Sequence, residues 1–321
     1  MSNKRGFFVI SLDFELMWGV LDVPYRESYK KNIRGGREAV PNILRLFEKY
    51  HVHATWATVG LLFLDNKGQL DEYSPTVKPS FKNGKVSSYN YIENIGTPDE
   101  EEALYFAKPL IELIKQTEGQ EIASHTYSHY YCNEEGADSD SFYHDIIAAK
   151  RVAKETFNVE IESLVFPRNQ AKDEFVKAAE KAGIKYWRGN ARGYSVVRSP
   201  FKRKVNRLCR LIDTYFPLFG HLCYDIDHSA EGIQCMKSSR LLRPYSNKLR
   251  WLEWLKLKRI KNQMEYAATN GKVFHLWWHP HNFGGNPEIM LNQLESILKF
   301  YSELHDKYNF TSCSMKELVK S

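Results

Sequence analysis

The chain has 321 residues, of which 43% are hydrophobic and 26% are charged, and its formal net charge is +6. This composition is ordinary for a globular protein and excludes intrinsic disorder and collagen-like structure. The length suits one large α/β domain or two modest ones, and a chain of this size can bury a core without disulfides or structural metals.

The N-terminal segment and the cysteines indicate the compartment. The sequence has no run of about 18 apolar residues, which a membrane-spanning helix needs. Its first residues join a basic segment to a short apolar run, as in a signal peptide, but Asp13 and Glu15 interrupt that run and no cleavage site follows. Five scattered cysteines without a CxxC pair indicate reduced thiols. We therefore expect a cytoplasmic protein whose chain opens with a strand.

Strands and helices are expected to alternate along most of the chain, because buried apolar runs are followed by apolar residues at helical spacing. The expected strands cover residues 7–12, 53–59, 120–124, 162–166, 184–187, 272–278 and 309–313. The expected helices cover residues 36–50, 97–119, 141–157, 172–182, 248–269 and 287–307. The pattern Thr97-Pro98-Asp99-Glu100 is typical of a helix cap. This alternation predicts parallel strands with helices outside, and about seven such units favour a closed or nearly closed barrel over an open sheet.

Ionisable or metal-binding side chains follow most of these strands. In barrels of parallel strands, active sites lie at the carboxyl ends of the strands. The side chains at those ends are Asp13 and Glu15, His125 and His129, Arg168, Arg188 and Asn190, and finally His279 and His281. We therefore expect them to converge on one mouth of the barrel.

The segment SHTYSH places two imidazoles four residues apart, at His125 and His129. Such a pair can face one metal ion on a helical turn or tight loop, although unrelated surface pairs share this spacing. Asp13 and Glu15 lie two apart at a strand end and so point to the same side. Zinc accepts two histidines and a carboxylate with an open position. The alternative for the carboxylates is an ordinary polar strand end or a salt bridge to Arg168.

The segment HLWWHPHNFG offers a proton donor. His279 directly follows the last long strand, and a histidine with a pKa near about 6.5 can give a proton to a leaving amine. Trp277 and Trp278 offer ring-stacking surface, with core packing as the alternative for one of them. His281 and Asn282 are candidate substrate contacts.

Taken together, these motifs resemble those of polysaccharide deacetylases with a NodB homology domain, carbohydrate esterase family 4. The segment EIASHTYSH is similar to the family's second motif, which implies that His125 and His129 bind a metal. SLDFE stands in place of the first motif, TFDD, and Asp13 falls on the position of the catalytic base. Phe14 replaces the usual metal-binding aspartate. Glu15 would supply the carboxylate ligand instead, as in relatives with an Asp-x-Asp spacing.

The remaining motifs agree with the family in order and spacing. FPRNQ stands where an arginine-containing third motif is expected, and Arg168 would pair with Asp13 and orient it. YWRGN is the counterpart of the fourth motif, without its aspartate. The segment that ends at His279 resembles the last motif, whose histidine is the catalytic acid. The resemblance covers residues 5–195 and 265–318.

The resemblance implies an irregular (β/α)7-type barrel of the NodB homology type and a metal-dependent N-deacetylase acting on a sugar of a surface polysaccharide or its precursor. The implied cofactor is a divalent metal, for which we expect zinc, and the implied partner is a glycan or sugar conjugate. The residues expected to contact the substrate are Trp18, Trp187, Arg188, Asn190, Trp278, His281 and Asn282. The alternatives are hydrolysis of another C–N bond, such as a formyl amide or the cyclic amide of allantoinase-like relatives, and a non-catalytic glycan-binding relative.

The stretch 196–262 does not follow the strand–helix alternation and is expected to be an insertion in a single domain covering residues 1–321. Residues 200–261 contain 14 Lys and Arg against 5 Asp and Glu, so the rest of the chain has 31 against 34. Three interpretations stay open: a solvated basic face, a groove for an anionic or diphosphate-linked glycan, and a surface that rests on anionic lipid. Because no recognition motif accompanies the charge, we expect no nucleic-acid partner.

Overall fold

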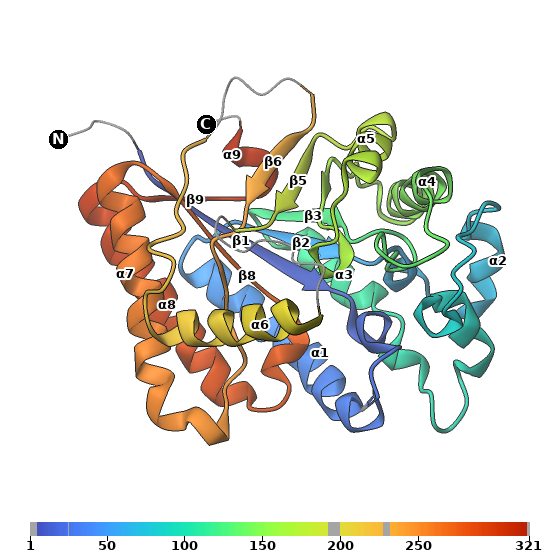
Figure 1. Ribbon diagram of the computed structural model, residues 1–321, viewed down its shortest axis with the longest axis horizontal. Helices are drawn as coiled ribbons and strands as arrows, with labels where there is room; N and C mark the ends of the chain where they lie inside the picture. The colour runs from blue at the N-terminus through green and yellow to red at the C-terminus, as the bar shows by residue number, and fades with distance from the viewer. Residues whose placement is uncertain (1–4, 25, 192–199, 227–231, 320–321) are drawn as a thin grey trace.

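A curved sheet of parallel strands forms the centre of the computed structural model, which describes residues 5–24, 26–191, 200–226 and 232–319 (Figure 1). The strands lie in the order β6-β5-β4-β3-β2-β1-β8-β7, and β9 pairs with β1. Their bounds are β1 Phe7–Phe14, β2 Ala54–Thr58, β3 Gln120–Ser124, β4 Ser163–Leu164, β5 Tyr186–Gly189, β6 Gln234–Lys237, β7 Arg240–Leu241, β8 Val273–Trp278 and β9 Thr311–Cys313. Every pairing between these strands is parallel, so their carboxyl ends meet at one edge.

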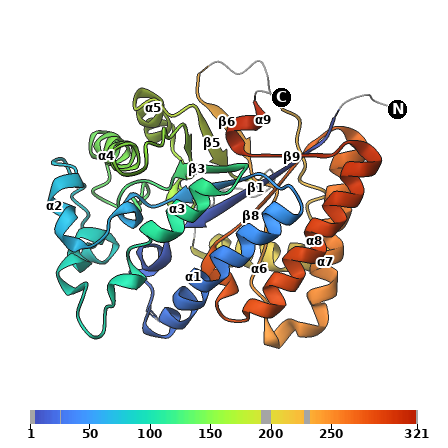
Figure 2. The ribbon, with the colours of Figure 1, turned by 180° about the vertical axis from the view of Figure 1, so that it is seen from behind.

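Helices flank the sheet on both sides. Their bounds are α1 Arg26–Lys49, α2 Leu70–Tyr73, α3 Lys108–Gln116, α4 Ser139–Phe157, α5 Asp173–Lys181, α6 Pro200–Tyr215, α7 Glu253–Asn270, α8 Pro287–Tyr308 and α9 Met315–Leu318. In Figure 2, α1, α3 and α8 lie in front of the sheet, whereas α6 lies on its other side, in front of it in Figure 1. The predicted α/β class is confirmed, and the predicted barrel takes the form of a curled, half-barrel sheet of parallel strands.

Strand β1 is buried along its whole length, because it has neighbouring strands on both edges and packed layers on both faces. Phe8 and Ile10 pack into the large core shared with the helices. Phe7 and Val9 belong to a smaller cluster formed by residues of several strands inside the curve of the sheet. Since side chains alternate along a strand, Asp13 lies on the same concave side as Phe7 and Val9.

The register of the strands brings the candidate ligands together. Phe14 of β1 lies beside Thr58 of β2, and Thr58 lies beside Ser124 of β3. The residues that follow these strand ends, Glu15 and His125, are therefore neighbours at the carboxyl edge of the sheet. The predicted convergence of β1 and β3 at one mouth is confirmed at these positions.

The helix expected at 97–119 is shorter than predicted, because α3 begins well after the capping pattern. Thr97 and Glu100 form an isolated antiparallel bridge instead. Glu100 is buried and makes ion pairs with Arg26 and with Lys30 of α1, the second at 3.5 Å. Contacts to a distant helix thus hold this segment in a turn and override its local helix signal.

The helix expected at 36–50 is longer than predicted, since α1 begins at Arg26. Gly35 and Gly36 lie inside this helix, where they touch the segment that follows β8. A Cβ atom at Gly36 would come within 2.5 Å of the Cα atom of His281. The two glycines therefore allow α1 to approach that segment closely and to support it.

Part of the basic stretch 196–262 belongs to the sheet, which corrects the expectation that it stands outside the strand–helix alternation. β6 pairs with β5, and β7 pairs with β8. Between β6 and β7, the N–H groups of Ser238 and Ser239 donate to carbonyls of β5 and β8. One short segment therefore links the two ends of the curved sheet. Residues 196–199 and 227–231 of the stretch lie outside the described residues.

Within the described ranges, no helix is both long enough and apolar enough to cross a membrane.

All five cysteines are free. Cys132 is buried, and this burial raises the pKa of its thiol well above the usual value. The Cys132 thiol is therefore protonated and unreactive.

Candidate metal and hydrolytic site

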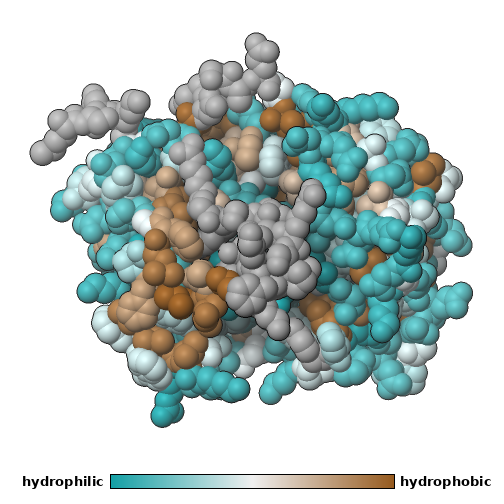
Figure 3. All heavy atoms as spheres, in the orientation of Figure 1, coloured by the Kyte–Doolittle hydropathy of each residue, from teal (hydrophilic) through white to brown (hydrophobic). Residues whose placement is uncertain are grey.

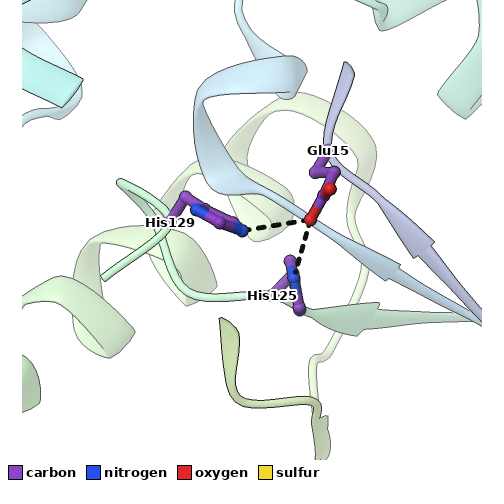
Figure 4. A group of neighbouring side chains, drawn as sticks. All are labelled: Glu15, His125 and His129. Atoms are coloured by element: carbon purple, nitrogen blue, oxygen red, sulfur yellow. Dashed lines mark hydrogen bonds and ion pairs between the residues drawn. The ribbon is translucent and has the colours of Figure 1, made fainter. Parts of the chain in front are cut away.

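Three side chains that the sequence predicts as metal ligands meet at the carboxyl edge of the sheet (Figure 4). Glu15 follows β1, His125 follows β3, and His129 lies in the loop after β3. The Glu15 Oε2 atom lies 3.2 Å from His125 Nε2 and 3.0 Å from His129 Nε2. All three side chains are buried, and one ligand atom of each lies within 4.8 Å of the others. We call Glu15, His125 and His129 the donor set.

A backbone contact fixes the proton of His125. Its Nδ1 atom lies 2.8 Å from the Val165 carbonyl oxygen, to which it donates. In the neutral ring, the lone pair of Nε2 is then directed toward Glu15. Burial lowers the pKa of His129, which favours the neutral ring that a metal ligand needs. Two imidazole nitrogens and a carboxylate oxygen fit zinc and similar divalent metals, so the residues present fit the implied cofactor.

A buried carboxylate that the sequence analysis missed holds the loop between the two histidines. Asp145 of α4 accepts hydrogen bonds from the Tyr127 N–H at 2.6 Å, the Ser128 hydroxyl at 2.5 Å and the Ser128 N–H at 3.3 Å. Burial raises the pKa of Asp145 to about 6, although these hydrogen bonds oppose the shift. A signal was present in the sequence: Asp145 lies among Phe142 and Ile146 on the apolar face of its helix, where an acidic group needs partners.

Asp13, the expected base, is paired with Arg188. Arg188 Nη1 lies 2.5 Å from Asp13 Oδ1, and Nη2 lies 2.8 Å from Oδ2. Nη1 also donates to Ser11 Oγ, and Nη2 to Asn169 Oδ1. Burial alone would raise the pKa of Asp13, but the Arg188 guanidinium and nearby histidines lower it below its usual value. Arg188 was expected to contact substrate, but it lies buried against Asp13 and is a positioning residue instead.

The prediction that Arg168 orients Asp13 is wrong. Arg168 Nη2 lies 2.5 Å from Asp22 Oδ1, and its guanidinium lies 4.3 Å from the centre of the Tyr131 ring. Arg168 is in the turn after β4, at a left-handed φ of 54°, whereas Arg188 is inside β5. From within its strand, Arg188 reaches Asp13 on the concave side of the sheet. From its turn, Arg168 binds Asp22 outside the sheet.

His279 completes the group of ionisable side chains. Its Nε2 atom lies 3.7 Å from Asp13 Oδ2 and 3.6 Å from Glu15 Oε1. The side chain is 25% exposed, whereas those of Asp13 and Glu15 are buried. Behind it, the His281 ring stacks on the His279 ring with centroids 4.9 Å apart, and burial lowers the pKa of His281 to about 3. His279 is therefore the member of the group that an incoming substrate can reach.

The family described as polysaccharide deacetylase matches residues 27–187, about half of the chain. The chain belongs to the polysaccharide deacetylase family. The matched range contains His125 and His129 but neither Asp13 nor His279, so the structure is what places those two beside the donor set.

Solved structures agree with this polysaccharide deacetylase fold. A candidate polysaccharide deacetylase from Mycobacterium smegmatis is 12% identical, with a TM-score of 0.59 over 98% of this chain and 90% of the other. A polysaccharide deacetylase candidate from Pseudomonas aeruginosa PAO1 is 11% identical, with a TM-score of 0.54 over 98% and 88%. A 4-alpha-glucanotransferase from Thermococcus litoralis is 14% identical, with a TM-score of 0.53 over 99% and 40%. No curated protein matches the sequence. At these identities the likeness shows the fold alone.

Two tryptophans expected to bind substrate lie in the core of the fold, so these two predictions are wrong. Trp18 is 1% exposed, and its indole N–H donates to the Tyr105 carbonyl at 2.7 Å. Trp278 is fully buried in the core shared with the helices. The neighbouring Trp277 points to the other face of β8, where its ring lies 4.3 Å from the guanidinium of Arg188. Of the two adjacent tryptophans, Trp277 is therefore the one that faces the site.

The other expected substrate contacts differ in accessibility. Asn190 is exposed, and Trp187 and Asn282 are half-buried. His281 is buried behind His279, which places it as a support for that ring rather than as a substrate contact. Asn190 is thus the most accessible polar side chain of this set.

Proposed function

We propose that this protein is a metal-dependent N-deacetylase that removes the acetyl group from an N-acetylated sugar of a surface polysaccharide or of its biosynthetic precursor. The observation that carries the proposal is the position of Asp13, which is paired with Arg188 and lies 3.7 Å from His279 Nε2, while Glu15 of the donor set lies 3.6 Å from the same atom. The site thus brings together a proton acceptor, a metal-binding set and a histidine that substrate can reach. Family membership supports the substrate class.

Each residue has a separate task in amide hydrolysis. The donor set would hold the metal, for which we propose zinc and which when bound polarises a carbonyl and lowers the pKa of water. Asp13 accepts the proton of the attacking water, because its lowered pKa keeps it ionised. Arg188 holds both oxygens of Asp13, so the base keeps one orientation. His279 donates a proton to the departing amine, which leaves as a free amino sugar.

The arrangement argues against a glycan-binding protein without catalysis. Burying a carboxylate–guanidinium pair rarely stabilises a fold more than apolar packing would. Here the pair lies within reach of a histidine and of the donor set. Such clusters of ionisable groups occur preferentially at catalytic sites, and this one has the parts that hydrolysis needs.

The test is release of acetate. Purified protein supplied with zinc should release acetate from an N-acetylated oligosaccharide, and mass spectrometry should show the matching loss of acetyl from the sugar. A chelator should stop the release, and added zinc should restore it. Formate release from an N-formylated sugar, with no acetate from the acetylated one, would favour the other C–N hydrolase. A protein that binds stoichiometric metal and releases neither acid would contradict the proposal.

A further inference from the structure

A cavity of about 650 Å³ lies beside the hydrolytic site, and we propose that it binds a phosphate or diphosphate group carried by the sugar substrate. The inference rests on the proposed deacetylase function, since it says which sugars that site acts on. The cavity lies between α6 and the segment that links β6 to β7 and β8. Four arginines line it: Arg207, Arg210, Arg240 and Arg243.

The cavity and the hydrolytic site share a wall. Trp277 lines the cavity, and its ring lies over the guanidinium of Arg188, which binds Asp13. Asn169 lines it as well, and its Oδ1 atom accepts a hydrogen bond from Arg188 at 3.0 Å. Asn190, the exposed predicted contact, donates to the Asn169 carbonyl from the same wall. When the acetamido group of a sugar lies at the hydrolytic site beside Asp13, another substituent of the same sugar can therefore enter the cavity.

The charge of the cavity is only partly compensated. Arg240 is neutralised, because its Nη2 lies 2.8 Å from the buried carboxylate of Asp213 and its Nε donates to Gln263. For Arg207 and Arg243, the described residues supply no side-chain hydrogen bond or ion pair, and no described residue that lines the cavity is acidic. At least two guanidinium groups thus offer their donors to a ligand. They belong to the stretch with 14 basic against 5 acidic residues.

This donor pattern favours phosphate over a single carboxylate. Guanidinium groups bind phosphate oxygens with paired hydrogen bonds, and each phosphate offers several oxygens. Two uncompensated positive charges match the charge of a diphosphate better than that of one carboxylate. The volume is within the range of sites for whole small ligands, so the phosphates and part of what they link to can enter.

A sugar diphosphate can be linked to a lipid or to a nucleotide, and the surface of helix α6 distinguishes the two. Arg207 and Leu211 line the cavity, whereas Val205, Ile212 and Phe216 of the helix and its end are exposed apolar side chains. Figure 3 shows apolar side chains gathered on this face, over the C-terminal half of α6 and beside it. A lipid-linked diphosphate would extend its chain along such a surface, and a nucleotide-linked one would have no need of it.

Calorimetric titration with inorganic pyrophosphate tests the site without relying on catalysis. Wild type should bind, and Arg207→Gln and Arg243→Gln should each weaken binding about tenfold or more, since each removes charge-assisted hydrogen bonds. Lys258→Gln removes an exposed cation outside the cavity and should bind as wild type does. His125→Ala should also bind unchanged. Loss of binding in His125→Ala would place pyrophosphate on the metal and overturn the proposal, as would unchanged binding in both arginine variants.

Deacetylation assays then compare three N-acetylated sugars: a neutral oligosaccharide, a nucleoside diphosphate sugar and a polyprenyl diphosphate sugar. Arg243→Gln should raise KM about tenfold for at least one diphosphate substrate and leave the neutral one unchanged. An additional effect of Ile212→Gln confined to the polyprenyl substrate would identify the lipid-linked source, and its absence the nucleotide-linked one. An equal rise for the neutral sugar would overturn the proposal. If no sugar is deacetylated, the proposed function fails, while the pyrophosphate titration still decides the phosphate site.

Discussion

An Arg188→Met variant is expected to lose about 3–5 kcal/mol of unfolding free energy and nearly all hydrolytic activity. The substitution leaves the Asp13 carboxylate buried without its counter-charge, and an uncompensated buried charge is strongly destabilising. Neither side chain of the pair is more than 4% exposed, so water cannot replace the lost partner. Activity falls as well, because both Asp13 oxygens lose the donors that orient them. Urea unfolding and an acetate-release assay measure the two effects.

Arg168→Met is the matched control. Its partner Asp22 is 15% exposed and Arg168 itself 37%, so we expect a change of less than about 1 kcal/mol. A double variant, Asp13→Asn with Arg188→Met, removes both charges and should regain most of the stability but none of the activity. A larger loss of stability in Arg168→Met than in Arg188→Met would show that Asp13 is paired as the sequence motif suggested and not as the structure has it.

The two arginines show what sequence order could and could not predict. Arg168 follows β4 and Arg188 lies in the neighbouring strand β5, so both were expected at the same mouth of the barrel. Strand alternation carries the missing information, since Tyr186 packs inside the curve of the sheet and Arg188, two residues later, shares its face. Arg168 follows its strand in a turn, where alternation no longer applies. Strand alternation could therefore have predicted Arg188, and not Arg168, as the partner of Asp13.

The same rule separates the two adjacent tryptophans. Val273 packs inside the curve of the sheet, and Trp277 lies four residues further along β8 on the same face. Phe274 and Trp278 share the opposite face and pack against the helices. The aromatic residue at the site was therefore predictable from the period of the strand, although the motif alone did not distinguish the pair.

The positions of Glu15 and His125 in the donor set were predictable from one physical rule. Parallel strands end at one edge, and Glu15 and His125 directly follow β1 and β3, which flank β2 in the sheet. The apolar face of α4 marks Asp145 as a buried acid, but local patterns do not show its partner, since Asp145 contacts the loop that carries His129 from a helix later in the chain. For the same reason the helix cap at Thr97 was overridden by ion pairs to α1. Contacts between distant segments leave little trace in local sequence.

An Asp145→Ala variant is expected to lose several kcal/mol of stability and to bind metal about 10–100-fold more weakly. The substitution leaves the Tyr127 N–H and the Ser128 N–H and hydroxyl without their acceptor, at about 1–3 kcal/mol for each buried group. These donors belong to the loop that carries His129, so metal affinity falls as it does when the support of a ligand is removed. Urea unfolding and competition with a chromophoric chelator measure both effects.

Asp140→Ala, in the first turn of the same helix, is the control for Asp145→Ala. Its side chain is 75% exposed and lies 3.9 Å from His144, so we expect a change within about 0.5 kcal/mol and unaltered metal affinity. An Asp145→Ala protein that keeps wild-type metal affinity while losing stability would show that the loop finds its geometry without this carboxylate.

The pH dependence of stability distinguishes a carboxyl group at this position from any other hydrogen-bond acceptor. Because burial raises the pKa of Asp145 from 3.8 to about 6, the folded protein holds more protons than the unfolded chain between these values. Stability from this group is therefore present at low pH and falls as pH rises through that window, by up to about 3 kcal/mol. Asp145→Asn cannot titrate, so wild type should lose stability relative to this variant between about pH 4 and 7. A constant difference between the two unfolding free energies across that range would mean that Asp145 is ionised in the fold at its usual pKa.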